Sequence, residues 1–188
     1  MKKIVFTGGG TAGHITPNIA IIDKLKDYEI YYLGTNGMEK DIITKYKNIK
    51  FIEIPAVKLI RSVTIKNLAL PFKLIHSINK TKKILKNINP SLVFSKGGFV
   101  SVPTCLAANS LKIPVITHES DLTIGLANKI ISKKAKYLCC SFKDTSDKFK
   151  KNSVYTGSPI REKIFNGNKF NVKLKNCPVF YNFLTFAC

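Results

Sequence analysis

Several features that would set a compartment or a redox chemistry are missing from this sequence. No run of about 18 apolar residues occurs, so no transmembrane helix is predicted. The start, MKKIVFTGGG, carries only a short apolar run, whereas a secretory signal needs about 7–15 apolar residues. The five cysteines form no CxxC pair, so neither a disulfide framework nor a zinc site is predicted. We therefore expect a protein of the cytoplasm.

Arginine and acidic residues are also scarce. The 188 residues include 31 Lys+Arg against 11 Asp+Glu, a formal net charge of +20, and only Arg61 and Arg161 are arginines. An AT-rich genome, which favours Lys, Asn and Ile, is one explanation. The other is an anionic partner, because no acid lies between Glu53 and Glu119. Such a stretch attracts phosphates or anionic lipid. Charge alone would also suit nucleic acid, but this partner ranks last and none is predicted, since lysines rather than arginines dominate and no stacking aromatics lie between them.

Short β-rich runs alternate with longer helical patterns along the chain. This rhythm predicts an α/β fold, a Rossmann-like parallel sheet with helices on both faces. Strands are predicted at 3–7, 29–33, 50–54, 91–95, 114–117, 137–141 and 153–156. Helices are predicted at 17–27, 38–47, 66–88, 101–111, 124–133, 144–151 and 160–165.

A glycine-rich loop follows the first predicted strand. Gly8, Gly10 and Gly13 satisfy GxGxxG, and Thr16–Pro17 predicts the start of the next helix. A dinucleotide site needs an acid about 20 positions on, but the second strand ends in LGTNG without one. A diphosphate without a ribose contact suits the loop better, and a tight turn without ligand is the alternative. His14 is either a general base or a donor to a phosphate.

Polar clusters follow three further strands. Lys96-Gly97-Gly98 precedes a helix and predicts a second anion site. His118-Glu119 either orients a sugar or holds a neighbouring loop, and TGSPIR ends in Arg161. Because ligands of open α/β sheets bind at the carboxyl ends of the strands, we expect one site there.

Four motifs, GGGTAGHITP, SKGGFVSVP, HESDLTIGLANK and TGSPIR, occur in this order. Together they resemble the N-terminal half of the bacterial N-acetylglucosaminyltransferases that convert lipid I to lipid II. That family has the GT-B fold, two Rossmann-like domains with a cleft between them. The resemblance covers residues 1–168 and implies an inverting transfer of GlcNAc from UDP-GlcNAc to the C4 hydroxyl of MurNAc in lipid I. It implies no cofactor and no metal, and no Asp-x-Asp motif is present.

The resemblance also implies roles for single residues. His14 matches the histidine proposed to assist deprotonation of the acceptor hydroxyl. Asn128 and Arg161 match positions that contact UDP-GlcNAc. Ala12 departs from the family, in which many members carry glycine, and we expect its methyl group to be tolerated. The remaining predicted substrate-binding residues, which hold the acceptor diphosphate or line the cleft, are Thr11, Ala12, Gly13, Gly97, Gly98, His118 and Glu119.

The long predicted helix carries an apolar stripe flanked by lysines. Such a patch can lie on an anionic membrane surface, and in the family a patch at the same place docks on the cytoplasmic membrane face. We therefore predict a peripheral protein on the inner leaflet. The alternative is that the apolar residues face the core. The patch consists of Leu68, Phe72, Ile75 and Ile78, with Lys73 beside them.

The end of the chain departs from the family. Residues 169–188 are apolar, free of acid and unlike any strand leading into a further glycine loop. We expect domain 1–168 to be followed by an atypical tail from truncation or frameshift, with the second domain absent. The chain alone is then inactive, because one wall of the donor cleft is missing. The alternatives are another GT-B enzyme, such as a UDP-GlcNAc 2-epimerase, and a non-catalytic fragment that binds acceptor or membrane.

Overall fold

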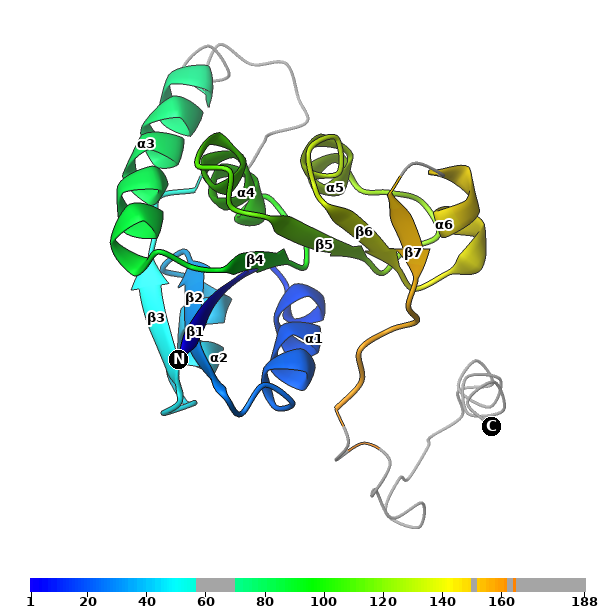
Figure 1. Cartoon of the computed structure of the whole chain (residues 1–188), viewed down its shortest axis with the longest axis horizontal. Helices are drawn as coiled ribbons and strands as arrows, with labels where there is room; N and C mark the ends of the chain where they lie inside the picture. Colours follow the sequence, from blue (N-terminus) through cyan, green and yellow to red (C-terminus); the bar gives the residue numbers. More distant parts are fainter. Residues whose placement is uncertain (57–69, 150–151, 162–163, 165–188) are drawn as a thin grey trace, which may run out of the picture.

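A computed structural model describes residues 1–56, 70–149, 152–161 and 164 of the chain. Seven parallel strands form one sheet in the order β3-β2-β1-β4-β5-β6-β7 (Figure 1). The strands are β1 (Lys2–Thr7), β2 (Tyr28–Gly34), β3 (Ile49–Glu53), β4 (Leu92–Ser95), β5 (Val115–Glu119), β6 (Tyr137–Cys140) and β7 (Ser153–Tyr155). The helices are α1 (Ala12–Ile22), α2 (Met38–Ile43), α3 (Leu70–Ile88), α4 (Ser101–Ser110), α5 (Leu126–Ile131) and α6 (Lys143–Lys148).

The sheet confirms the predicted Rossmann-like fold, and each predicted strand is present within two residues of its expected bounds. The strand order reverses between β1 and β4, which are direct neighbours paired from Ile4–Leu92 to Thr7–Ser95. In open α/β sheets the loops after two such strands leave in opposite directions, and the place where they part, at the carboxyl ends of the strands, is the crevice in which ligands bind. Both glycine loops begin there.

Two apolar cores flank the sheet. Helices α1 and α2 cover one face, and α3, α4 and α5 cover the other (Figure 1). The first core gathers Phe6, Ile19 and Tyr32, whereas the second gathers Val5 and Val93 with residues of the other three helices. Neighbouring residues of one strand therefore enter different cores, as the alternation of side chains along a strand requires.

The predicted start of the first helix is wrong. Helix α1 begins at Ala12, after Thr11 in extended conformation, and ends at Ile22, with Pro17 inside it. The predicted start at Thr16–Pro17 assumed that proline opens the helix, because proline in the interior removes a hydrogen bond to the preceding turn. Burial of Ile15 and Ile19 in the core holds the helix across that missing bond. As a result, His14 lies in the first turn of α1 instead of in a loop.

The other predicted helices differ mainly at their ends. The structure describes α3 from Leu70, so Leu68 lies outside the described residues, as does the predicted tail 169–188. A helix was also predicted at 160–165, but Ile160 and Arg161 are not helical. No helix among the described residues is long and apolar enough to cross a membrane.

Candidate active site

The two glycine loops touch each other at the crevice. Gly98 has a φ of +78°, and a Cβ atom placed on it would lie 2.7 Å from the carbonyl oxygen of Gly9. Gly10 has a φ of +84°, and a Cβ atom placed on it would lie 2.8 Å from the Phe99 ring. Both positions need glycine, because a side chain would have neither the backbone conformation nor the space. Because Gly10 and Gly98 have no side chains, the two glycine loops can approach each other this closely.

His14 lies where the loops meet. Its Nδ1 atom is 2.9 Å from the Thr11 hydroxyl, and a Cβ atom on Gly98 would lie 3.4 Å from the same nitrogen. Burial and then the positive charge of Lys96 lower the pKa of His14, against the opposing effect of Glu119, Asp121 and a Gly9 backbone hydrogen bond. The imidazole is therefore neutral near pH 7, the form that accepts a proton.

The first turn of α1 presents the predicted phosphate-binding residues to solvent. Thr11, Ala12 and Gly13 are exposed there, next to the half-buried His14. Backbone N–H groups of a first helical turn have no partner within the helix, and the helix dipole favours a negative charge beside them. This turn, with Gly98 opposite, has the features of a diphosphate site.

Buried hydrogen bonds under the sheet edge hold the first glycine loop in place. The Tyr32 hydroxyl donates to the Gly8 carbonyl oxygen at 2.6 Å and accepts from the Asn18 amide at 3.1 Å. The same amide also donates to the Thr7 carbonyl oxygen at 3.2 Å. Because Tyr32 and Asn18 are both buried, these bonds replace the water that the loop would otherwise need.

Glu39 is a site-shaping residue that sequence reasoning missed. Its carboxylate is buried (1% exposed) and accepts hydrogen bonds from the Thr35 N–H at 2.8 Å, from the Thr35 hydroxyl and from the Gly10 N–H at 3.3 Å. A Cβ atom on Gly9 would lie 2.6 Å from its carboxyl carbon. Its contact with Gly10 spans 29 positions, so no local spacing indicates it.

Lys96 and His118 form a buried pair on the other side of the crevice. The Lys96 ammonium group donates to His118 Nδ1 at 2.7 Å and to the Ser120 hydroxyl, while His118 Nε2 lies 2.9 Å from the Gly157 carbonyl oxygen. Burial lowers the pKa of Lys96 to about 8, and burial together with Lys96 lowers the pKa of His118 to about 4. His118 is therefore neutral at pH 7.

Glu119 and Asn128 organise the loop that follows β5. Glu119 accepts hydrogen bonds from the backbone of Ser120, Asp121 and Gly125, and from the Asn128 amide at 3.0 Å. Asn128 in turn accepts from Thr117 at 2.7 Å and donates to the His118 carbonyl oxygen. Both side chains thus support the protein itself, which matches the loop-holding alternative for Glu119. Their contact with a substrate stays a prediction.

Two further predicted residues border this cluster. Gly97, with a φ of +85°, is buried, and a Cβ atom on it would lie 2.8 Å from the Asn128 amide nitrogen. Arg161 follows the Gly157 loop, and its Nε atom is buried without a hydrogen-bond partner among the described residues. An unpaired buried donor is costly, so Arg161 is available to an acceptor that lies outside the described residues.

The predicted membrane patch is only partly assembled. Phe72 (76% exposed) and Ile75 (55% exposed) lie near the start of α3, and Lys73 is exposed between them. Ile78 instead packs against the core, so it does not belong to this surface. The exposed apolar pair is one helical turn apart, on one side of α3.

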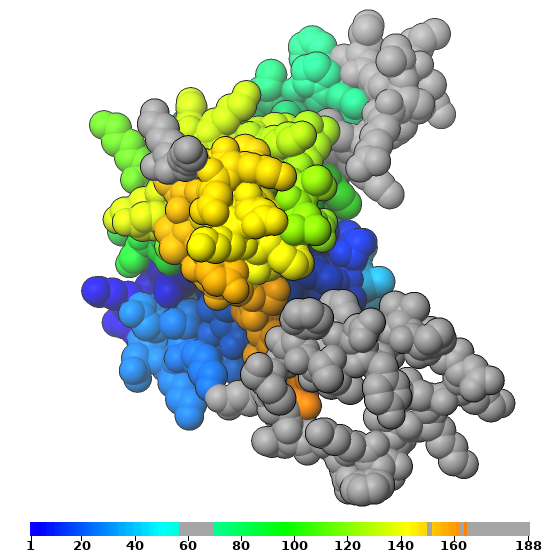
Figure 2. Space-filling model, turned by 90° about the vertical axis from the view of Figure 1, so that its right-hand side faces the viewer, coloured from blue at the N-terminus to red at the C-terminus, as the bar shows by residue number. Residues whose placement is uncertain are grey.

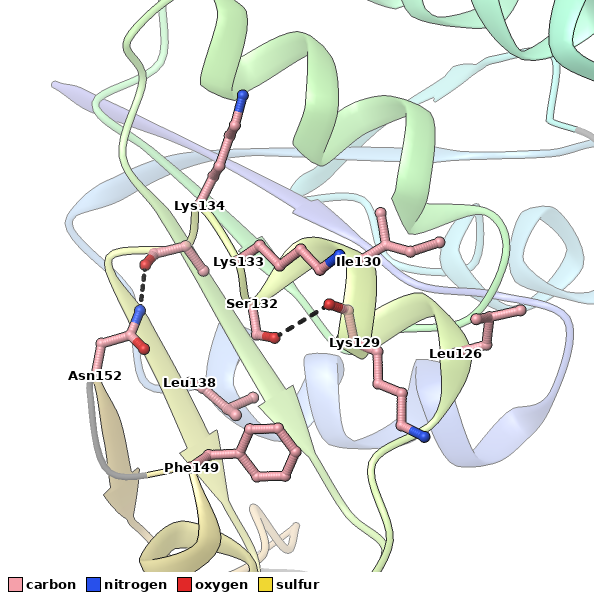
Figure 3. Close-up of a pocket in the computed structure, with 10 residues that line it drawn as sticks. Leu126, Lys129, Ile130, Ser132, Lys133, Lys134, Leu138, Phe149 and Asn152 are labelled. Carbon is pink, nitrogen blue, oxygen red and sulfur yellow. Dashed lines mark hydrogen bonds between the residues drawn. The ribbon is translucent and has the colours of Figure 1, made fainter.

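A groove of about 840 Å³ runs between α5 and the end of α6 (Figure 3). Leu138 and Phe149 lie at its apolar floor, with Lys129, Lys133 and Lys134 around them. The space-filling view shows the segment from α6 to β7, coloured yellow to orange, above the blue N-terminal part of the chain (Figure 2). Residues 132–135 and Asn152 of the groove precede β6 and β7. The groove therefore reaches the amino ends of these strands, whereas the glycine loops lie at the carboxyl ends of β1 and β4.

Metal-binding chemistry has no support in the described part of the chain. Residues 1–56, 70–149, 152–161 and 164 contain no group of three or more His, Cys, Asp or Glu side chains that could hold a metal ion.

Comparison with known proteins points to one family. The model of the glycosyltransferase family 28 N-terminal domain matches residues 4–139. A UDP-N-acetylglucosamine–N-acetylmuramyl-(pentapeptide) pyrophosphoryl-undecaprenol N-acetylglucosamine transferase of Lachnospira eligens is 51% identical over 173 residues, 90% of this chain and 49% of the relative. A protein of the same name from Clostridium tetani is 50% identical over 89% of this chain and 48% of its own length. The chain thus spans about half the length of these curated relatives.

Solved structures agree with this result. MurG of Acinetobacter baumannii superposes with a TM-score of 0.71 at 30% identity, over 87% of this chain and 47% of that one. A complex of MnaA from S. aureus with UDP reaches a TM-score of 0.64 over 92% of this chain and 48% of that one. Its identity is 16%, so that likeness shows the fold alone.

Proposed function

This chain belongs to the glycosyltransferase family 28 N-terminal domains, and from that premise we propose that it is the acceptor-binding half of an inverting GlcNAc transferase. The donor is UDP-GlcNAc, and the acceptor is the C4 hydroxyl of MurNAc in undecaprenyl-pyrophosphoryl-MurNAc-pentapeptide. The product is lipid II, a precursor of peptidoglycan. The names of the Lachnospira and Clostridium relatives support this choice of donor and acceptor.

The observation that carries the proposal is the contact of two glycine loops around a neutral histidine. The diphosphate of lipid I lies against the first turn of α1 and Gly98, where backbone N–H groups receive it. His14 then accepts the proton of the C4 hydroxyl as that oxygen attacks the anomeric carbon of GlcNAc. The bond from the anomeric carbon to the UDP oxygen breaks on the opposite side, so the configuration inverts and UDP leaves with the bonding electron pair.

The loops after β5 and β7 serve the donor in this proposal. Arg161 has a buried Nε atom without a partner in the described chain, and its guanidinium charge suits the phosphates of UDP-GlcNAc. His118, Glu119 and Asn128 keep these loops in place through their mutual hydrogen bonds. Thr11, Ala12, Gly13, Gly97 and Gly98 form the acceptor side.

Transfer of radiolabelled GlcNAc from UDP-GlcNAc to a lipid I analogue tests this function. We expect little turnover by the 188 residues alone, because they span about half the length of the curated relatives and a donor cleft between two domains needs both of its walls. A chimera that joins residues 1–161 to the C-terminal half of the Lachnospira eligens relative should transfer GlcNAc, and its His14→Ala variant should not. An inert but folded chimera would contradict the proposal, and so would release of an epimerised UDP-sugar as the product.

A peripheral position on the cytoplasmic face of the membrane is the second part of the proposal. Its support is the exposed pair of Phe72 and Ile75 beside Lys73, within a stretch of sequence free of acid from 54 to 118. Apolar side chains flanked by lysines suit a surface of anionic lipid. Docking there brings the glycine loops within reach of an acceptor that is anchored in the bilayer by its lipid tail.

A further inference from the structure

Lys96 is a buried lysine in an unusual environment. Its side chain is 2% exposed, directly after β4, and within the described residues it forms no ion pair with a carboxylate. The ammonium group instead donates to His118 Nδ1 at 2.7 Å and to the Ser120 hydroxyl. Lysine is almost never fully buried unless it is paired with an opposite charge. A neutral histidine and a hydroxyl offset only part of the free-energy cost of burying the Lys96 ammonium group.

The contacts of Lys96 join three strand ends. A lysine ammonium group only donates, so His118 Nδ1 must accept, and the ring proton therefore resides on Nε2. That proton is donated to the Gly157 carbonyl oxygen at 2.9 Å. One chain of hydrogen bonds thus runs from the end of β4, through His118 in β5, to the loop after β7. Gly97 and Gly98 follow Lys96 directly, and Gly98 lies against Gly9 of the first glycine loop.

We propose that Lys96 is a positioning residue of the transferase site, which locks the ends of β4, β5 and β7 together and places its positive charge beside His14: the Cβ atom of Lys96 and the His14 carbonyl oxygen lie 3.1 and 3.0 Å from the same Cβ position on Gly8. The inference rests on the proposed function only for the use of His14 as a base, which needs a free ring nitrogen. Lys96 acts through His118 and through its charge, and it touches neither donor nor acceptor in this proposal.

The charges around His14 support this assignment. Lys96 faces it from the second glycine loop, and Glu119 and Asp121 face it from the end of β5 and the loop beyond. The two acids favour the imidazolium and the lysine opposes it, so burial and Lys96 together decide the direction of the His14 pKa, which is lowered. Glu119, Asp121 and Cys139 oppose the loss of the Lys96 proton, whose pKa of about 8 leaves the group charged at pH 7.

Titration of the histidine rings by NMR tests the proposal without any need for activity. The chain has three histidines, and the exposed His76 on α3 serves as a reference in the same sample. In Lys96→Met we expect the titration midpoint of His14 to rise, because a positive charge that opposes the imidazolium is removed. Ser120→Ala is the matched control, because it removes a partner of Lys96 but keeps the charge, and its His14 midpoint should equal that of the wild type.

Two outcomes would overturn the inference. One is a folded Lys96→Met protein in which the His14 midpoint does not move. The other is measured on the wild type, so it is available even if Lys96→Met does not fold. The chemical shifts of the His118 ring should change in a second step near pH 8, because the neighbouring Lys96 ammonium group loses its proton there. Unchanged His118 shifts around pH 8 would contradict the assignment. A failed transferase assay with the chimera would leave these titrations intact, so the two proposals fail separately.

Discussion

The backbones of Gly9 and Gly98 touch, since a Cβ atom on Gly98 would lie only 2.7 Å from the Gly9 carbonyl oxygen. The loops after β1 and β4 therefore form one unit, although almost ninety positions separate them in the sequence. A change in either loop should disturb the other, and this expectation leads directly to the first prediction.

Gly98→Ala should lower the free energy of unfolding by about 2 kcal/mol or more, measured by urea denaturation. The left-handed backbone alone costs a residue with a side chain about 1 kcal/mol, and the contact with the Gly9 carbonyl adds to it. Gly157→Ala is the matched control, because Gly157 has a φ of +70° but no atom within 4 Å of its Cβ position. Equal losses in the two variants would show that the loops are not in contact.

Glu39→Gln should destabilise the protein by about 1–3 kcal/mol at pH 7, because the first glycine loop loses a charged acceptor. Burial raises the pKa of Glu39, but hydrogen bonds from Thr35 and Gly10 outweigh it, and the net pKa is lowered. Since the folded-state pKa is the lower one, this stabilisation is present above the unfolded-state pKa and is lost as pH falls through the folded-state value. Urea denaturation at pH 7 and near pH 3 should show the difference shrinking in acid.

Tyr32→Phe should cost about 1–2 kcal/mol, because the Gly8 carbonyl oxygen and the Asn18 amide both lose a buried partner. Tyr31→Phe is the control one position away on the other face of β2, where the hydroxyl only donates to Glu29 at 2.8 Å. Thermal unfolding compares the two, and a loss in Tyr31→Phe as large as in Tyr32→Phe would refute the role given to Tyr32.

His118 should make the protein sensitive to mild acid. Its folded-state pKa of about 4 lies below the ordinary value of 6.5, so between these two pH values the unfolded chain binds the proton and the folded chain does not. The free energy of unfolding should therefore fall, by on the order of 2 kcal/mol, as pH drops from 6.5 to 4. His118→Asn should flatten this part of the curve, and an unchanged curve in that variant would contradict the role given to His118.

The double variant Phe72→Glu/Ile75→Glu should bind vesicles of anionic phospholipid at least about tenfold more weakly in flotation assays. Each substitution removes apolar surface worth about 1.5–3 kcal/mol when buried and adds a charge of the wrong sign. Met38→Glu on α2, which is also exposed, controls for the change in charge. Unchanged flotation of the double variant would exclude this surface as the membrane contact.

The sequence predicted the strands well, but it did not predict the side chains that hold the glycine loops in place. The physical reasons differ. Strands such as LVFS in β4 are apolar throughout because both sheet faces are covered, and that pattern is local. By contrast, Glu39 reaches Gly10 across 29 positions, and nothing near Glu39 in the sequence indicates such a partner. The start of α1 was misplaced because proline is a strong local signal, and burial of Ile15 and Ile19 overrode it.

By itself the sequence determined the alternation of strands and helices, the two glycine loops and the family to which the motifs belong, because each depends on residues that lie close together along the chain. Only the tertiary structure decided which side chains act together. It brought His14 between the two loops, moved Ile78 from the membrane patch into the core and turned Glu119 and Asn128 toward their own loop. Packing of the sheet selects these partners, since it alone sets the distance between residues far apart in sequence.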